Sequence, residues 1–177
     1  EMYLKSYDIP YRVYGGTSFF QRAEVKDVLA YLALMSNPAD NLAFLRVVNV
    51  PRRGIGAAAI DALEAEASAR DVSLFTAAMT AEQLPVKTAA KLRAFCDIIT
   101  SVYARITGQP LADTVETLLA AIGYDAFLRE EKKENYESRA EVVAELVGYI
   151  REFEAGIDAS QTDPLAAFLE NVALFLQ

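Results

Sequence analysis

The strongest constraint on the fold of this chain is a short turn signal between two stretches of helical sequence. Residues 51–56 read PRRGIG, so that Gly54 and Gly56 flank Ile55, and a helix-forming run starts immediately afterwards. Glycine permits positive φ angles and lets another group approach the main chain closely. The pattern therefore predicts a tight turn that opens directly into the N-terminus of a helix.

The spacing of apolar residues predicts helices on both sides of this turn. Apolar side chains recur every three or four positions over residues 22–36, and an apolar run over residues 42–50 leads up to the glycines. Further helices are expected at residues 57–70, 74–79, from 85 to a stop at 108–110, and at 113–122, 124–134, 142–153 and from 163 onwards. A short strand is expected at residues 9–14. The fold class is therefore all-α, an irregular multi-helix bundle with a short N-terminal β-strand and a helix-hairpin-helix-like turn.

Local signals place several helix ends. Asp40 is suited to cap the helix before the turn, and Gly123 is suited to end the helix that precedes it. Asp163 followed by Pro164 is typical of a helix start, because proline is favoured at the first helical position. These signals depend only on neighbouring residues.

The composition excludes several classes of function. The 177 residues contain no histidine, so a Ser-His-Asp triad or a histidine metal site cannot form, and no glycine is followed by lysine, so no G-x-x-x-x-G-K-[ST] phosphate loop occurs. We expect no catalytic residues, no metal site and no bound cofactor in this chain. The lone cysteine, Cys96, lies in an apolar helical pattern and is expected to be buried.

The chain is acidic and has no membrane-spanning stretch. Its net charge of −8 predicts long-range repulsion from nucleic acid, so any contact with DNA must be local. No long uncharged apolar segment or signal peptide is visible, which predicts a cytoplasmic protein without a membrane partner. The apolar helical pattern that reaches the last residue suggests a piece of a longer protein.

The glycine turn is a candidate phosphate site. Free N–H groups in the first turn of a helix, together with the helix dipole, favour an anion there. Arg52 and Arg53 would add charged contacts, and Lys26 could supply another. The alternative is an inert turn between helices with solvated arginines, and composition alone leaves both open.

Phe19 and Phe20 allow two interpretations as well. Two aromatic residues at the entrance to an amphipathic helix usually pack onto the core. The alternative is stacking on unpaired bases.

Several segments, in the order in which they follow one another along the chain, resemble the UvrD/PcrA/Rep family of superfamily-1 DNA helicases. They are IPYRVYGG at residues 9–16, FFQRAEVKD at 19–27, AYL at 30–32, VNVPRRGIG at 48–56 and DPLAAFL at 163–169. The resemblance is dense as far as Gly56 and thin between Ala57 and Glu137. It implies that residues 1–14 end motor domain 2A, that residues 15–172 form the helical 2B subdomain, and that residues 173–177 begin the return to 2A.

The resemblance also implies a function and its residues. The family consists of ATP-driven 3′ to 5′ helicases of repair and replication restart, whose 2B subdomain contacts duplex DNA and regulates unwinding. ATP and Mg²⁺ would bind outside this chain, and the partners would be the duplex backbone near a single-strand junction, the motor domains in cis and a repair protein. The DNA-binding residues carried over are Gly54, Ile55, Gly56, Arg52, Arg53, Lys26 and Arg22, and the hinge residues are Gly15 and Gly16.

Two departures from the family pattern bear on DNA contact. Alanines occupy residues 57–59, where relatives can have hydroxyl or charged side chains, and Val142 stands where asparagine is usual. Only backbone contacts would then remain at the start of the helix. A protein-interaction or autoinhibitory module with little DNA affinity of its own is therefore the alternative function.

Overall fold

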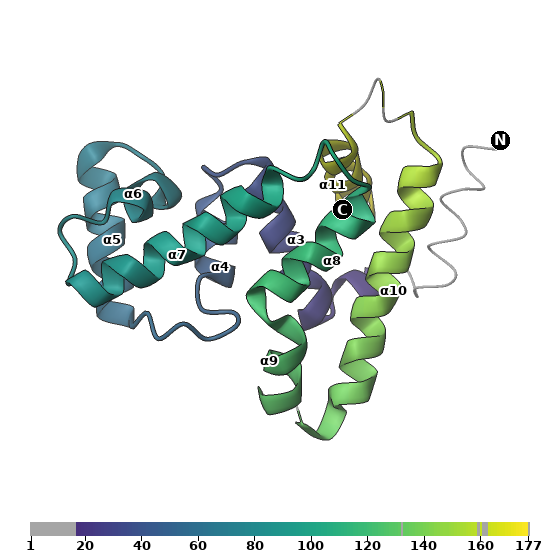
Figure 1. The fold of residues 1–177 in the computed structure, drawn as a ribbon, viewed down its shortest axis with the longest axis horizontal. Helices are drawn as coiled ribbons and strands as arrows, with labels where there is room; N and C mark the ends of the chain where they lie inside the picture. The colour runs from purple at the N-terminus through teal and green to yellow at the C-terminus, as the bar shows by residue number, and fades with distance from the viewer. Residues whose placement is uncertain (1–16, 132, 159, 161–162, 177) are drawn as a thin grey trace.

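The computed structural model describes residues 17–131, 133–158, 160 and 163–176. Within these residues the fold is entirely helical, which confirms the expected class (Figure 1). The expected strand at residues 9–14 and the hinge glycines Gly15 and Gly16 lie outside the described residues. The helices are α2 (Thr17–Phe20), α3 (Ala23–Ser36), α4 (Asn41–Val47), α5 (Ala57–Arg70), α6 (Leu74–Thr80), α7 (Val86–Tyr103), α8 (Leu111–Ile122), α9 (Tyr124–Glu131), the 3₁₀ turn η1 (Lys133–Asn135), α10 (Tyr136–Ala155) and α11 (Pro164–Phe175).

The helices form two groups that α3 and the long helix α7 connect. Helix α6 packs against α5 and against the first half of α7, whereas α8, α9, α10 and α11 gather toward the other end of α7 (Figure 1). Helix α3 packs against α4, α7, α10 and α11. The connection between α4 and α5 passes below α7 in this view, reaches toward α8 and returns to α5, so it runs between the two groups (Figure 1).

The expected caps are present. Asp40 Oδ1 accepts the Ala43 N–H at 3.0 Å, and Asp163 Oδ1 accepts the Leu165 N–H at 3.0 Å with Pro164 at the start of α11. Gly123 ends α8 in the left-handed conformation with φ 69°. Ser73, which the sequence analysis did not single out, caps α6 through the Thr76 N–H at 3.1 Å. Capping is local chemistry, which is why short sequence signals find it.

Two helix ends differ from expectation. Helix α7 stops at Tyr103 instead of continuing to residues 108–110, because Arg105, Ile106 and Gly108 donate to carbonyls only three residues back and tighten the chain into turns. Helix α9 ends at Glu131, and the short turn η1 precedes α10.

The core contains large aromatic side chains. Tyr31 and Phe44 pack against Phe95 with ring centres 6.2 and 5.5 Å apart, and Tyr149 packs against Phe168 at 5.6 Å. Phe19 and Phe20 are 5% and 4% exposed and belong to this core, so the base-stacking alternative for them is wrong. Cys96 is buried as expected, and burial raises the pKa of its thiol to about 12.

The apolar run before the glycine turn is only partly buried. Ala43, Phe44 and Val47 face the core, whereas Leu42 is 82% exposed and Leu45 is 38% exposed. Helix α4 packs on α3 through one narrow face, which leaves these two leucines on the other side.

Candidate nucleic-acid interface

The turn signalled by the sequence connects α4 to α5. Gly54 has φ +72°, the conformation for which glycine is suited, and Gly56 is the N-cap of α5 with φ −72°. Both glycines are exposed, as are Ala57 and Ala58 behind them. The turn is therefore open to solvent at the beginning of a helix of 14 residues.

Ile55 anchors this turn to the body of the protein. Its side chain is only 3% exposed. Its main chain is clamped by one side chain, because Asn49 Nδ2 donates to the Ile55 carbonyl at 2.7 Å and the Ile55 N–H donates to Asn49 Oδ1 at 3.1 Å. The N–H of Ile55 is thus already used, which leaves the amides of its glycine and alanine neighbours for a ligand.

Arg53 points inward. Its Nη1 donates to the carbonyls of Val47 and Val48 at 2.9 and 3.0 Å, where α4 ends, and its Nη2 donates to the Tyr31 hydroxyl at 2.7 Å. Burial raises the pKa of Tyr31 to about 12 despite this nearby guanidinium, so the hydroxyl remains protonated and donates to the Val50 carbonyl. Arg53 therefore closes the C-terminal end of α4 from inside the loop.

Arg52 points outward. Its side chain is 79% exposed, and its Nη2 lies 3.1 Å from Glu131 Oε2 at the end of α9. An exposed ion pair of this kind contributes little free energy, so Arg52 can exchange Glu131 for another anion at small cost. The side chains of the two adjacent arginines thus point in opposite directions, that of Arg53 into the protein and that of Arg52 into solvent.

The N-terminal amides of α5 form the donor set at this site. The first hydrogen bond of α5 runs from the Ile60 N–H to the Gly56 carbonyl at 3.1 Å. The N–H groups of residues 57–59 have no intrahelical acceptor, because the first turn of any helix lacks one. Together with the helix dipole they can bind an anion through the backbone alone.

The remaining predicted DNA-binding residues, Arg22 and Lys26, lie at the start of α3. Arg22 is exposed ahead of α3 and lines two clefts beside Ser138 of α10, while Lys26 is half-buried on α3. Among the described residues, no hydrogen bond or ion pair joins Arg22 or Lys26 to residues 52–56. Arg52 is thus part of the turn itself, whereas these two cations make no direct polar contact with it among the described residues.

Helix α3 carries buried carboxylates beside Arg22 and Lys26. Glu24 is 1% exposed and accepts from Arg139 of α10. Asp27 accepts from the Tyr124 hydroxyl at 2.8 Å and pairs with Arg46 at 3.1 Å. Burial raises the pKa of Asp27, although Tyr124 and Arg46 oppose that shift.

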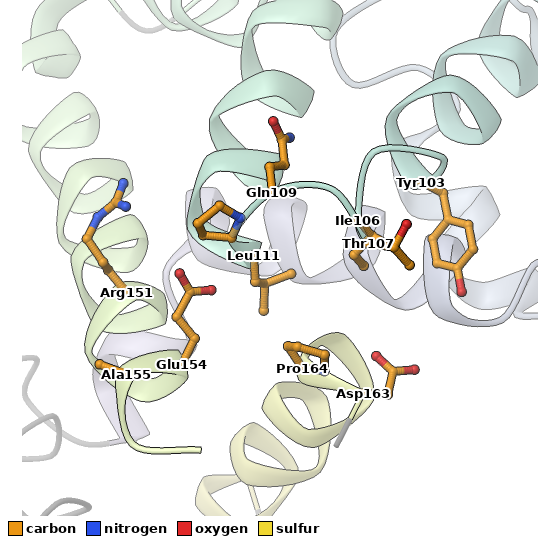
Figure 2. A pocket seen from close by; sticks show the side chains of 11 residues that line it. Tyr103, Ile106, Thr107, Gln109, Leu111, Arg151, Glu154, Ala155, Asp163 and Pro164 are labelled. Carbon is orange, nitrogen blue, oxygen red and sulfur yellow. The ribbon is translucent and has the colours of Figure 1, made fainter. Parts of the chain in front are cut away.

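A separate pocket of about 800 Å³ opens between the start of α8, the end of α10 and the start of α11 (Figure 2). Its charged groups already have structural roles. Arg151 pairs with Asp113 and Glu116, Glu154 accepts the Ala112 N–H at 3.2 Å, and Asp163 caps α11. The pocket therefore presents no set of carboxylates arranged for acid–base chemistry.

The sequence patterns did not indicate three residues of the site. Asn49 and Tyr31 hold the loop from beneath, and Lys91 of α7 approaches Gly54 from the side, since a Cβ built on Gly54 would lie 3.2 Å from Lys91 Nζ. Asn49 stands within the segment that leads into the turn and could have been suspected. Lys91 is far away in the sequence, and no local pattern connects it to the turn.

The model of the UvrD-like helicase C-terminal domain matches residues 1–177. The chain belongs to this family. It is 37% identical to DNA helicase II of Haemophilus influenzae over 94% of its length, and 34% identical to the ATP-dependent DNA helicase PcrA of Bacillus subtilis over 93%. It is also 39% identical to the ATP-dependent DNA helicase Rep of Buchnera aphidicola over 75% of its length.

This UvrD-like chain spans less than a quarter of these relatives, covering 23%, 22% and 20% of them respectively. No described helix is both long and apolar enough to cross a membrane. Within the same residues, no group of three or more acidic or cysteine side chains is placed to hold a metal ion.

Proposed function

We propose that this chain is the 2B subdomain of a UvrD/PcrA/Rep-type ATP-dependent DNA helicase and that it holds the backbone of duplex DNA next to a single-strand junction. In this proposal residues 15–172 form the subdomain, and residues 1–14 and 173–177 connect it to motor domain 2A. ATP and Mg²⁺ would bind to motor domains outside the chain, and the helicase would act on the bacterial nucleoid.

One observation carries the proposal. The exposed turn at Gly54 and Gly56 presents the free amides of α5, while Ile55 and Arg53 anchor the same turn from beneath. An exposed donor set on a fixed base suits contact with phosphates, which positions DNA without reading its sequence. Alanines at residues 57–59 add no side-chain contact, so binding should be weak, with a dissociation constant on the order of 10⁻⁴ to 10⁻⁶ M at physiological salt.

A pair of substitutions at Gly56 tests this function without disturbing the fold. Gly56 has negative φ, and a Cβ placed on it meets nothing within 4 Å. Asp and Asn are similarly good N-caps and have almost the same size, so Gly56→Asp and Gly56→Asn differ mainly in charge. We expect Gly56→Asp to bind a fluorescent duplex at least about 10-fold more weakly than Gly56→Asn, because its carboxylate occupies the place of a phosphate.

The two variants should unfold at similar temperatures, with Gly56→Asp no less stable, since a negative charge favours a helix N-terminus. Equal duplex affinity of the two variants would contradict DNA contact at this turn. Affinity should also fall steeply with salt for the unsubstituted chain.

A second candidate function is docking on protein, either on the motor domains in cis or on a repair protein, with autoinhibition as its consequence. Leu174 and Leu176 at the end of α11 are 65% and 48% exposed, and the chain is acidic overall. Deleting residues 15–169 from the parent helicase distinguishes the two functions. Faster unwinding after the deletion, with no duplex affinity in the 177-residue chain, would favour docking.

A further inference from the structure

Lys91 of α7 lies beside the glycine turn, although neither its sequence position nor its neighbours signal this. A Cβ built on Gly54 would lie 3.2 Å from Lys91 Nζ, so the ammonium group sits against the one residue of the turn with positive φ. Lys91 is exposed. The Lys91 side chain thus reaches the exposed edge of the turn and not its buried base.

The position of Lys91 relative to the turn is fixed by the core. Phe95 follows Lys91 by one helical turn on the same face of α7, and the Arg53 guanidinium lies 4.7 Å from the centre of the Phe95 ring. The N-terminal half of α7 and the loop before α5 lie side by side (Figure 1). Lys91 is therefore carried by a rigid helix that packs directly on the loop.

Lys87 lies one helical turn before Lys91 on the same face of α7. Lys87 is exposed, and neither Lys87 nor Lys91 forms an ion pair or side-chain hydrogen bond with any residue that the structure describes. By contrast, six arginines pair with carboxylates: Arg46, Arg52, Arg70, Arg129, Arg139 and Arg151. In a protein with a net charge of −8, these two neighbouring lysines carry positive charge that no described ion pair neutralises.

We propose that Lys91 and Lys87 form the second half of the duplex-binding surface and contact phosphates next to those held by the amides of the glycine turn. This inference rests on the proposed function and extends its site onto α7. Four residues of α-helix span about 6 Å, and one DNA strand carries a phosphate about every 3.4 Å along the duplex axis. The spacing of the two lysines is therefore close to two phosphate steps of one strand, about 6.8 Å, so each ammonium group can reach its own phosphate.

The test compares Lys91→Ala with Arg93→Ala in the 177-residue chain. Arg93 is also exposed on α7, but two residues further on it faces a different direction, and it forms no ion pair with a described residue. Both changes remove one positive charge from the same helix. Only Lys91→Ala removes a cation that lies at the turn.

Duplex affinity is measured by fluorescence anisotropy between 50 and 200 mM salt. Each lost phosphate contact reduces the magnitude of the slope of log affinity against log salt by about 0.9. Between 50 and 200 mM salt, one such contact accounts for a loss of about 3-fold in duplex affinity. We expect this reduction for Lys91→Ala, about twice as much for the double variant Lys87→Ala and Lys91→Ala, and an unchanged slope for Arg93→Ala. Circular dichroism melting curves should coincide, because all three side chains are exposed.

A Lys91→Ala slope equal to that of Arg93→Ala would overturn the inference. If Gly56→Asp still weakened binding in that case, the proposed function would stand and only the role of α7 would fall. Absence of any duplex binding by the unsubstituted chain at 50 mM salt would overturn both.

Discussion

The guanidinium carbon of Arg53 lies 4.7 Å from the centre of the Phe95 ring and joins the loop before α5 to the long helix α7. The same guanidinium donates to carbonyls at the end of α4 and to the Tyr31 hydroxyl. One side chain therefore bonds to three separate elements beneath the candidate DNA-binding turn.

Arg53→Lys should destabilise the protein even though it keeps the charge. Lysine lacks the planar fork that serves carbonyls and hydroxyl together, and it stacks less well on an aromatic ring. We expect a loss of about 2 kcal/mol in the free energy of unfolding by urea, because hydrogen bonds to a charged group are each worth about 1.5–3 kcal/mol and only some are retained. Arg52→Lys is the matched control and should change stability by less than about 0.5 kcal/mol, since Arg52 is 79% exposed. Equal effects at the two positions would contradict the inward role of Arg53.

The two glycines of the turn should respond differently to alanine. Gly54→Ala places an L-residue at φ +72° with its Cβ 3.2 Å from Lys91 Nζ, and we expect it to cost about 1–2 kcal/mol. Gly56→Ala meets no atom within 4 Å and should cost only about 0.5 kcal/mol, as alanine is a poorer N-cap than glycine. Chemical unfolding of both variants measures the difference. A larger cost at Gly56 would mean that the turn conformation is not the one described.

Arg139→Ala should be among the most destabilising single changes in the protein. It leaves the carboxylate of Glu24, which is 1% exposed, without a charged partner. Breaking a buried pair from one side costs about 3–5 kcal/mol. The double variant Glu24→Gln and Arg139→Ala removes the stranded charge as well and should recover part of that loss in urea unfolding. If the double variant were less stable than Arg139→Ala alone, the charge pairing would not be the cause.

Ionisation of Asp27 should lower the free energy of unfolding as the pH rises above 3.8, the pKa of the free carboxyl group. Burial raises the pKa of Asp27 in the folded state above the 3.8 of the free group, so the folded state binds its proton more tightly than the unfolded state. The contribution to stability is present below pH 3.8 and is lost as the pH rises through the folded-state pKa. Urea unfolding from pH 3.5 to 7 should show this decline, and Asp27→Asn should flatten it. An unchanged profile in Asp27→Asn would assign the decline to other groups.

The helices were largely predictable, and so was the location of the candidate site. Asp40, Gly123 and Asp163 end or begin helices through contacts with residues two to four positions away, so the sequence contains the whole interaction. The end of α7 was not predictable in this way. Its apolar pattern continues to Ile106, but a series of hydrogen bonds to the third preceding residue ends the helix at Tyr103.

From the amino-acid sequence alone it follows that the described part of the chain is largely helical, that residues 54–56 form a turn before a helix, and that the chain belongs to the UvrD-like helicase family. The role of each residue within the turn, by contrast, follows from how the helices pack. Arg52 and Arg53 are adjacent and identical in type, yet one faces solvent and the other faces Phe95. Lys91 joins the turn from a distant helix. The direction of a side chain and its long-range neighbours depend on how helices pack, and a local sequence pattern carries no information about that packing.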